Sequence, residues 1–252
     1  MTKKIVKVGF CIPNEGHTEP EAYDNRMMFC QHLGALQVLS SMGLDELDGH
    51  KFVYPKDTKF EFYVTSIGKV FTALAREKLA DEAVESGLDY IMMIDDDMIT
   101  DMDFFERLYA HNVDIVAGLA FTRSFPHSPV IYEVKKGYDP IARKNYYINY
   151  TLYTYPKDTL VECDAVGFGG VLIKTAVLKG MKKPWFMTTS GAGEDIHFCH
   201  MAKEQGFKVF MDTSVKMGHI GYAPIITEKE YEDARNMEEL RRIYGDRSRC
   251  PK

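Results

Sequence analysis

Three consecutive carboxylates, Asp95, Asp96 and Asp97, follow the short apolar run of residues 91–94. The run is too short for a full helix and is typical of a buried strand. Like charges this close raise each other's pKa, and raising a carboxylate pKa by one costs about 1.4 kcal/mol. A divalent ion relieves that repulsion, and hard ions such as Mg²⁺ and Mn²⁺ prefer oxygen ligands and leave room for phosphate oxygens. The pattern therefore predicts a metal site that holds a nucleotide diphosphate, although a charged loop that caps the next helix would also produce it.

Two further sets of residues could join this chemistry. His219 lies in the segment KMGHIGYAP; a lone histidine is more often structural, but next to carboxylates an imidazole ligand shifts the metal preference modestly toward Mn²⁺. Glu194 and Asp195 begin a predicted helix over residues 194–205 behind a glycine-rich stretch. The helix dipole alone favours acids at this position. The alternative is that one of them is a general base that deprotonates an acceptor hydroxyl.

Two arginines and a histidine-rich run are weaker candidates. Arg76 lies inside a predicted helix, and Arg123 follows a predicted strand. Arginine suits bidentate phosphate contacts, although a solvated surface arginine is more common. His197 and His200 would share one helix face, but no second ligand pair at zinc spacing occurs near them.

The elements that must position these residues follow from the apolar pattern. Strands are predicted at residues 5–12, 60–65, 90–94 and 114–121. Helices are predicted at residues 24–42 and 69–86, and a third, short helix is predicted to end at His111. The segment 45–57 is predicted to be irregular. This alternation predicts an α/β fold with a mostly parallel, doubly wound sheet flanked by helices. Ligands of such sheets gather at the carboxyl ends of the strands. Those ends are Pro13, Thr65, Asp95 and Phe121.

The second half predicts a mixed or antiparallel extension of the sheet. Strand-like segments occupy residues 130–134, 146–153 and 160–174, the last interrupted by glycines at 167–170. A strand at 208–212 and a final helix up to residue 244, opened by a capping box of Thr227 and Glu230, complete it. We expect one domain over residues 1–222, with a nucleotide-binding half (1–121) and an acceptor and catalytic half (122–222). Residues 223–252 would form a C-terminal helical tail that could act as a lid.

Bulk composition narrows the class of protein. The 252 residues are 45% hydrophobic, and the net charge of −6 argues against broad nonspecific nucleic-acid binding, although a local basic groove could still exist. No apolar stretch approaches the length of a membrane span, and the start has no signal-peptide pattern. The five scattered cysteines form no CxxC pair, so we expect reduced thiols and a cytoplasmic protein.

The motifs together resemble a known family. IDDD at residues 94–97, the glycine-rich strand, GED at 193–195 and GH at 218–219 resemble, in this order, the GT-A glycosyltransferases. Within them the chain is most similar to the small soluble family-2-like enzymes of bacteria and phages, over residues 6–222. The resemblance implies a DxD motif in which Asp97 binds the metal and Asp95 contacts the ribose or a metal-bound water. Asp96 fills the variable position, so which two of the three acids bind the metal is open.

The resemblance also implies roles for the other candidates. His219 would complete the metal shell on the diphosphate, and Asp195 would be the base of inverting members, with Glu194 next to it. Four more residues would lie beside the donor: Pro13 and Arg76 at the nucleotide, and Gly169 and Gly170 on the sugar and acceptor side.

The implied activity is transfer of a hexose or pentose from a UDP- or GDP-sugar to an acceptor hydroxyl, with Mn²⁺ or Mg²⁺ as cofactor. Inversion is expected if Asp195 is the base, and retention stays open. The acceptor could be a saccharide, a protein, a small molecule or a modified nucleobase. The last would suit a phage-encoded enzyme in its host's cytoplasm. The QxxRW motif of processive synthases is missing, since the only tryptophan, Trp185, lies in KKPWF.

Two alternatives remain. A sugar-phosphate nucleotidyltransferase usually has a glycine-rich basic loop after its first strand, where this chain has the acidic PNEGHTEPE. A nonenzymatic nucleotide-binding module would bind without transfer. The absence of GxxxxGK[ST] and of GxGxxG gives no support for a P-loop NTPase or a dinucleotide-binding domain.

Overall fold

The computed structural model describes residues 3–14, 19–139, 143–189, 192–221 and 225–244. The predicted tail beyond residue 244 and the proposed domain boundary at residue 222 lie outside the described residues, as does Gly191 of the glycine-rich stretch before the helix at 194.

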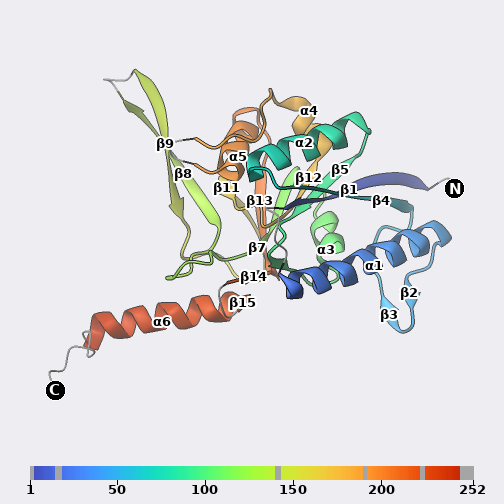
Figure 1. The fold of residues 1–252 in the computed structure, drawn as a ribbon, viewed down its shortest axis with the longest axis horizontal. Coiled ribbons are helices and arrows are strands. Elements are labelled where there is room, and N and C mark those ends of the chain that lie inside the picture. The colour runs from blue at the N-terminus through green and yellow to red at the C-terminus, as the bar shows by residue number, and fades with distance from the viewer. Residues whose placement is uncertain (1–2, 15–18, 140–142, 190–191, 222–224, 245–252) are drawn as a thin grey trace.

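The described part of the chain is organised around a seven-stranded sheet (Figure 1). Its strands, in spatial order, are β10 (Leu160–Cys163), β13 (Val209–Lys216), β7 (Ile115–Leu119), β12 (Gly170–Lys174), β5 (Tyr90–Ile94), β1 (Lys4–Asn14) and β4 (Thr58–Gly68). β1 pairs in parallel with β4 and β5, as the sequence predicts, and β13 also pairs in parallel with β7. β12 lies antiparallel between β5 and β7, and β10 is antiparallel to β13. The predicted α/β fold is therefore confirmed, with the second half inserted into the sheet.

Helices cover both faces of this sheet. α1 (Pro20–Met42) and α3 (Phe104–Ala110) pack on one face, and α2 (Thr72–Glu85), α4 (Thr175–Gly180) and α5 (Glu194–Glu204) pack on the other (Figure 1). Side chains of β5 alternate between the two cores: Ile91 and Met93 face the α2 side, while Met92 and Ile94 face the α1 side. A strand buried on both faces is apolar throughout, which explains why polar and apolar residues do not alternate in the run before the three acids.

The helix ends agree with the sequence in part. Gly43 (φ 79°) follows α1 and Gly87 (φ 66°) follows α2, both in the left-handed region that favours glycine. α1 begins at Pro20, earlier than predicted, because proline is tolerated in a first helical turn. Asp103 occupies the N-cap position of α3, although its side chain makes no capping hydrogen bond. No helix was predicted at α4.

Smaller sheets account for the other differences. The predicted strand at 160–174 is divided into β10, β11 (Ala165–Val166) and β12, and β11 pairs with the hairpin of β8 (Ile131–Asp139) and β9 (Lys144–Thr151). This hairpin projects from the body of the molecule (Figure 1). The segment predicted to be irregular contains the short hairpin of β2 (Glu46–Leu47) and β3 (His50–Lys51). His219, for which the sequence predicts no strand, lies in β14 (Gly218–Ile220), between β6 (Met98–Ile99) and β15 (Ile225–Ile226).

The last helix, α6 (Glu228–Tyr244), begins at the predicted capping box, because the Thr227 N–H donates to the Glu230 carboxylate at 2.9 Å. Tyr231 in its first turns stacks on Phe121 with ring centroids 4.7 Å apart, and the rest of the helix points away from the sheet (Figure 1). A lid function for this helix stays a prediction. Among the helices of the described residues, none is both long enough and apolar enough to cross a bilayer.

Side chains of α1 protect the free edge of the sheet at β4. The Phe60 N–H donates to Ser40 Oγ at 3.0 Å, and the Phe62 N–H donates to Gln37 Oε1 at 2.7 Å. Unpaired edge groups otherwise invite pairing with another chain. We expect Ser40→Ala to leave the buried Phe60 N–H without its partner and to lower the free energy of unfolding by about 1–3 kcal/mol in urea titrations. Ser41→Ala, on the exposed neighbour, is the control, and equal stability of the two variants would contradict this role of Ser40.

Candidate functional site

The three acids lie at the carboxyl end of β5, at the edge where the sequence predicts a ligand. The Asp95 N–H donates to the Gly169 carbonyl at 3.0 Å, and the Met98 N–H donates to the Asp95 carbonyl at 3.3 Å, so the chain turns sharply here. A pocket of about 340 Å³ opens at this turn. It is lined by Pro13, Glu19, Thr72, Asp95, Asp96, Asp97, Arg123 and His219. We refer to it as the acid pocket. Segments far apart in the sequence, from β1 to β14, meet in it.

Asp97 and His219 are in direct contact in the lining of the acid pocket. β14 pairs with β6 directly after the acids, and this brings His219 Nε2 to 3.2 Å from Asp97 Oδ2. Nδ1–H of His219 donates to the Phe121 carbonyl at 2.7 Å, which turns Nε2 toward Asp97. Arg123 Nη1 also lies 3.2 Å from Asp97 Oδ2. Burial alone would raise the pKa of Asp97, but its hydrogen bond to His219 and the charges of His219 and Arg123 hold that pKa below its ordinary value.

The other two acids have cations of their own. Asp95 Oδ1 lies 2.6 Å from Arg76 Nη2. Asp96 is only 8% exposed, and its charge interacts with Arg26 of α1, whose pKa is lowered by burial. Each member of the triplet is therefore compensated by a different partner. Side-chain cations therefore relieve the repulsion that the sequence assigns to a divalent ion, because the sequence does not reveal which distant cations the fold brings in.

The structure brings together fewer possible metal ligands than the sequence predicts. Within the described ranges, no group of three or more His, Cys, Asp or Glu residues could hold a metal ion. The predicted trio of Asp95, Asp97 and His219 is not assembled, because Asp95 is turned to Arg76. The carboxylate of Asp97 and the imidazole of His219 remain together, and Mg²⁺ sites commonly use one or two protein ligands plus water and substrate phosphates. This pair fits a site that a bound diphosphate would complete.

Arg76 is paired with Asp95 of the acid pocket but does not belong to the pocket lining. Its side chain is 3% exposed and forms ion pairs with Asp95 and, through Nη1, with Glu194, while Nη2 donates to the Phe168 carbonyl at 3.2 Å. Burial alone would lower the pKa of Arg76, but the two carboxylates raise it, so the guanidinium is charged. This one side chain connects the end of β5 with the start of α5. Contact of Arg76 with a nucleotide stays a prediction.

Asp195 lies in the first turn of α5 behind the Gly193 N-cap. Its Oδ1 accepts the Ile196 N–H at 2.7 Å, and a Cβ on Gly193 would come within 2.8 Å of the same oxygen. Burial, reinforced by the charge of Glu194, raises the pKa of Asp195 despite the opposing effect of Arg76. Burial and the charge of Asp195 together raise the pKa of Tyr132, on β8, to about 12. A carboxylate with a raised pKa, whose charge interacts with Arg76 and with Asp95 of the acid pocket, is suited to accepting a proton.

The glycines of the 167–170 turn are fixed by packing. A Cβ on Gly170 would lie 2.6 Å from Met217 Sδ, and one on Gly169 would lie 3.2 Å from Met98 Sδ. Their predicted position beside the donor sugar stays a prediction. On α5, His200 Nε2 lies 3.0 Å from Asn149 Oδ1 of β9. This histidine belongs to no metal-binding group in the described part of the chain.

Sequence reasoning missed four residues near the site: Glu19, Thr72, Arg26 and Tyr132. Thr72 could have been found, because it precedes Arg76 by four residues and a helix places both on one face. Glu19 and Arg26 come from the first part of α1 and its N-cap, and Tyr132 comes from β8. These segments are far from the three acids along the chain, so no local sequence pattern links them to the site.

Comparison with known proteins supports the fold only. No protein family model and no curated protein sequence matches the chain. Among solved structures, A197 from STIV is similar with a TM-score of 0.55 and 18% identity, over 89% of this chain and 92% of A197. GalNAc-T7, solved with UDP, GalNAc and Mn²⁺, is similar with a TM-score of 0.50 and 12% identity, over 92% of this chain and 48% of its own. At these identities the likeness shows the fold: the chain has the α/β architecture of the GT-A glycosyltransferases.

Proposed function

We propose that this protein is a metal-dependent glycosyltransferase that moves a sugar from a nucleotide-diphosphate sugar to an acceptor hydroxyl. The observation that carries the proposal is the pairing of Asp97 with His219 in a pocket at the carboxyl end of the central sheet. The fold shared with GalNAc-T7, whose structure holds UDP and Mn²⁺, supports it.

The donor would bind with its diphosphate in the acid pocket. Asp97 and His219 would hold Mn²⁺ or Mg²⁺, which would supply Lewis acidity to the departing diphosphate. Arg123, 3.2 Å from Asp97 and about half exposed, could reach a phosphate oxygen once the metal takes over the carboxylate. Pro13, which lines the acid pocket, would lie beside the nucleotide.

The acceptor would be activated by Asp195. Its carboxylate would take the proton of the acceptor hydroxyl as the new glycosidic bond forms, which is a single displacement with inversion at the anomeric carbon. Arg76 would hold Glu194, and thereby the first turn of α5, in a fixed position relative to Asp95. Tyr132 would lie on the acceptor side, close to the base.

We expect Asp97→Asn to lower transfer at least about 100-fold, because one of the two metal ligands loses its charge. The assay incubates the full chain with UDP- and GDP-sugars, a panel of acceptors and Mn²⁺, and measures nucleoside diphosphate release. Asp101→Asn, on an exposed acid four residues away, is the control. Full activity of Asp97→Asn in the presence of a chelator would refute metal dependence, and release of pyrophosphate from a nucleoside triphosphate would identify a nucleotidyltransferase instead.

A further inference from the structure

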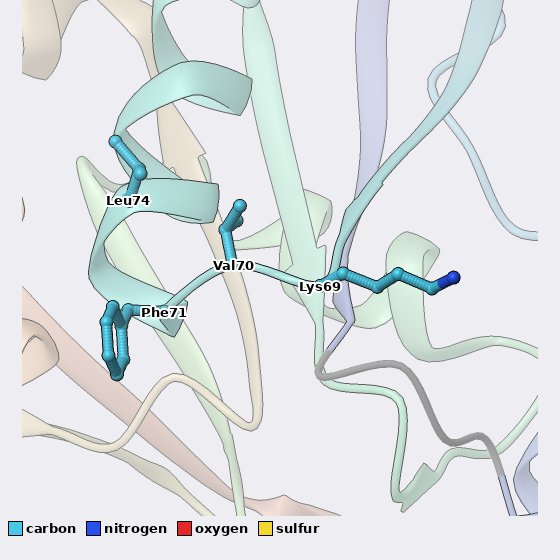
Figure 2. Close-up of a pocket in the computed structure, with 4 residues that line it drawn as sticks. All are labelled: Lys69, Val70, Phe71 and Leu74. Atoms are coloured by element: carbon cyan, nitrogen blue, oxygen red, sulfur yellow. The ribbon is translucent and has the colours of Figure 1, made fainter.

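An apolar pocket opens beside the acid pocket at the start of α2. It has a volume of about 670 Å³ and is lined by Lys69, Val70, Phe71 and Leu74. Figure 2 shows Phe71 and Leu74 projecting on the same side of the helix, while Lys69 extends in the opposite direction. Phe71 is 89% exposed and Leu74 is 45% exposed. Burying a phenylalanine side chain stabilises a protein by about 1.5–3 kcal/mol, and Phe71 contributes almost none of this to the fold.

The backbone holds Phe71 in a fixed position. Lys69 adopts φ 62°, in the left-handed region, and its N–H donates to the Asn14 carbonyl at 3.0 Å. The Phe71 carbonyl accepts the N–H groups of Leu74 and Ala75 at 2.9 and 3.0 Å, as the N-cap of α2. The ring is therefore displayed from a well-bonded turn and not from the end of a free loop. A non-glycine residue in a rare backbone conformation is a feature that clusters at binding sites.

The same turn belongs to the proposed active site. Thr72, the next residue, lines the acid pocket, and Arg76, one helical turn further, is paired with Asp95 and Glu194. A substrate that reaches from the acid pocket across the N-terminus of α2 would meet Phe71 next.

The chemistry of the lining limits what this substrate part can be. Val70, Phe71 and Leu74 have no polar side-chain atom, and Lys69 points away from them in Figure 2. Reading the edge of a nucleobase needs hydrogen-bonding side chains, which these three lack. A ring that packs by its face needs only an aromatic platform and aliphatic neighbours.

We propose that Phe71 and Leu74 form the acceptor subsite, which binds a ring-bearing glycoside acceptor through the face of a sugar or aryl ring. This inference rests on the proposed glycosyltransferase function. It assigns the acceptor to small glycosides with an apolar ring face and gives Phe71 the role of stacking partner.

The test measures binding of phenyl β-glucoside and methyl β-glucoside to the full chain by saturation-transfer NMR, and separately the thermal shift caused by UDP or GDP with Mn²⁺. We expect wild type to bind the phenyl glycoside more tightly than the methyl glycoside. Phe71→Ala should weaken phenyl glycoside binding about ten-fold, while Phe71→Tyr should retain it. Phe125→Ala, on a phenylalanine 54% exposed outside the pocket, is the control and should match wild type.

Each outcome decides the question. Loss of glycoside binding in Phe71→Ala, with an unchanged nucleotide shift, supports the acceptor subsite. If Phe71→Ala loses the thermal shift caused by the nucleotide but still binds the glycoside, Phe71 would belong to the donor site. This result would overturn the inference, while the proposed function stands. No phenyl glycoside binding by wild type, or equal binding by Phe71→Ala, also overturns it. No nucleotide shift in any protein would refute the proposed function, and the acceptor assignment would fall with it.

Discussion

Replacing Asp195 with asparagine is expected to lower sugar transfer about 10²–10⁴-fold, the usual contribution of a general base. Asparagine keeps the size of the side chain and can still accept the Ile196 N–H through its amide oxygen, so the first turn of α5 should be preserved. The thermal shift caused by a nucleotide diphosphate and Mn²⁺ should therefore equal that of wild type. Asp103→Asn, on an exposed acid at the start of α3, is the matched control and should keep full activity.

The pH profile gives the same prediction a second readout. The base must be ionised, and burial raises the pKa of Asp195 above the ordinary aspartate value of 3.8. Wild-type kcat/KM should therefore fall as pH decreases through this raised pKa, and the acid limb should lie above pH 3.8. The residual rate of Asp195→Asn should lack that limb. An Asp195→Asn variant with wild-type kcat/KM, or with the same acid limb, would exclude Asp195 as the base.

The strands of the first half could be predicted because each satisfies a local rule. Ile91 to Ile94 is buried on both faces and therefore apolar throughout, and Gly43 and Gly87 end their helices at left-handed positions. The place of β12 could not be predicted in this way. It follows β5 in the sequence by about 75 residues and yet inserts beside it, since pairing between distant strands depends on packing that no local pattern encodes.

The candidate site shows the same division between local and distant information. The sequence indicates that Asp97 and His219 belong together only through the order of motifs, and the fold brings them to 3.2 Å by pairing β14 with β6. It does not indicate that Asp95 and Asp96 are compensated by Arg76 and Arg26, because a helical arginine has the same pattern whether it is solvated or buried. For this reason the three predicted metal ligands do not form one group within the described residues.

Replacing Arg76 with methionine is expected to have the largest effect on stability. Methionine fills much of the same volume but leaves Asp95 and Glu194 without their shared cation. Removing one partner of a buried ion pair typically costs about 3–5 kcal/mol, and the side chains of these two acids are only 27% and 16% exposed. Urea or thermal unfolding of Arg76→Met should show a loss of this size. Lys78→Met, on the exposed face of the same helix, should unfold like wild type.

A triple variant separates charge from packing. Arg76→Met combined with Asp95→Asn and Glu194→Gln removes all three charges, and neutral replacements of buried ion pairs are often tolerated. We expect this variant to recover most of the lost stability but no transfer activity, because the connection between the end of β5 and the start of α5 is still missing. If the triple variant is as unstable as Arg76→Met, the cost comes from lost packing of the guanidinium and not from stranded carboxylates. If Arg76→Met alone keeps both stability and transfer, Arg76 neither stabilises the fold through its ion pairs nor positions the base, and the link it makes between the donor and acceptor sides has no role in function.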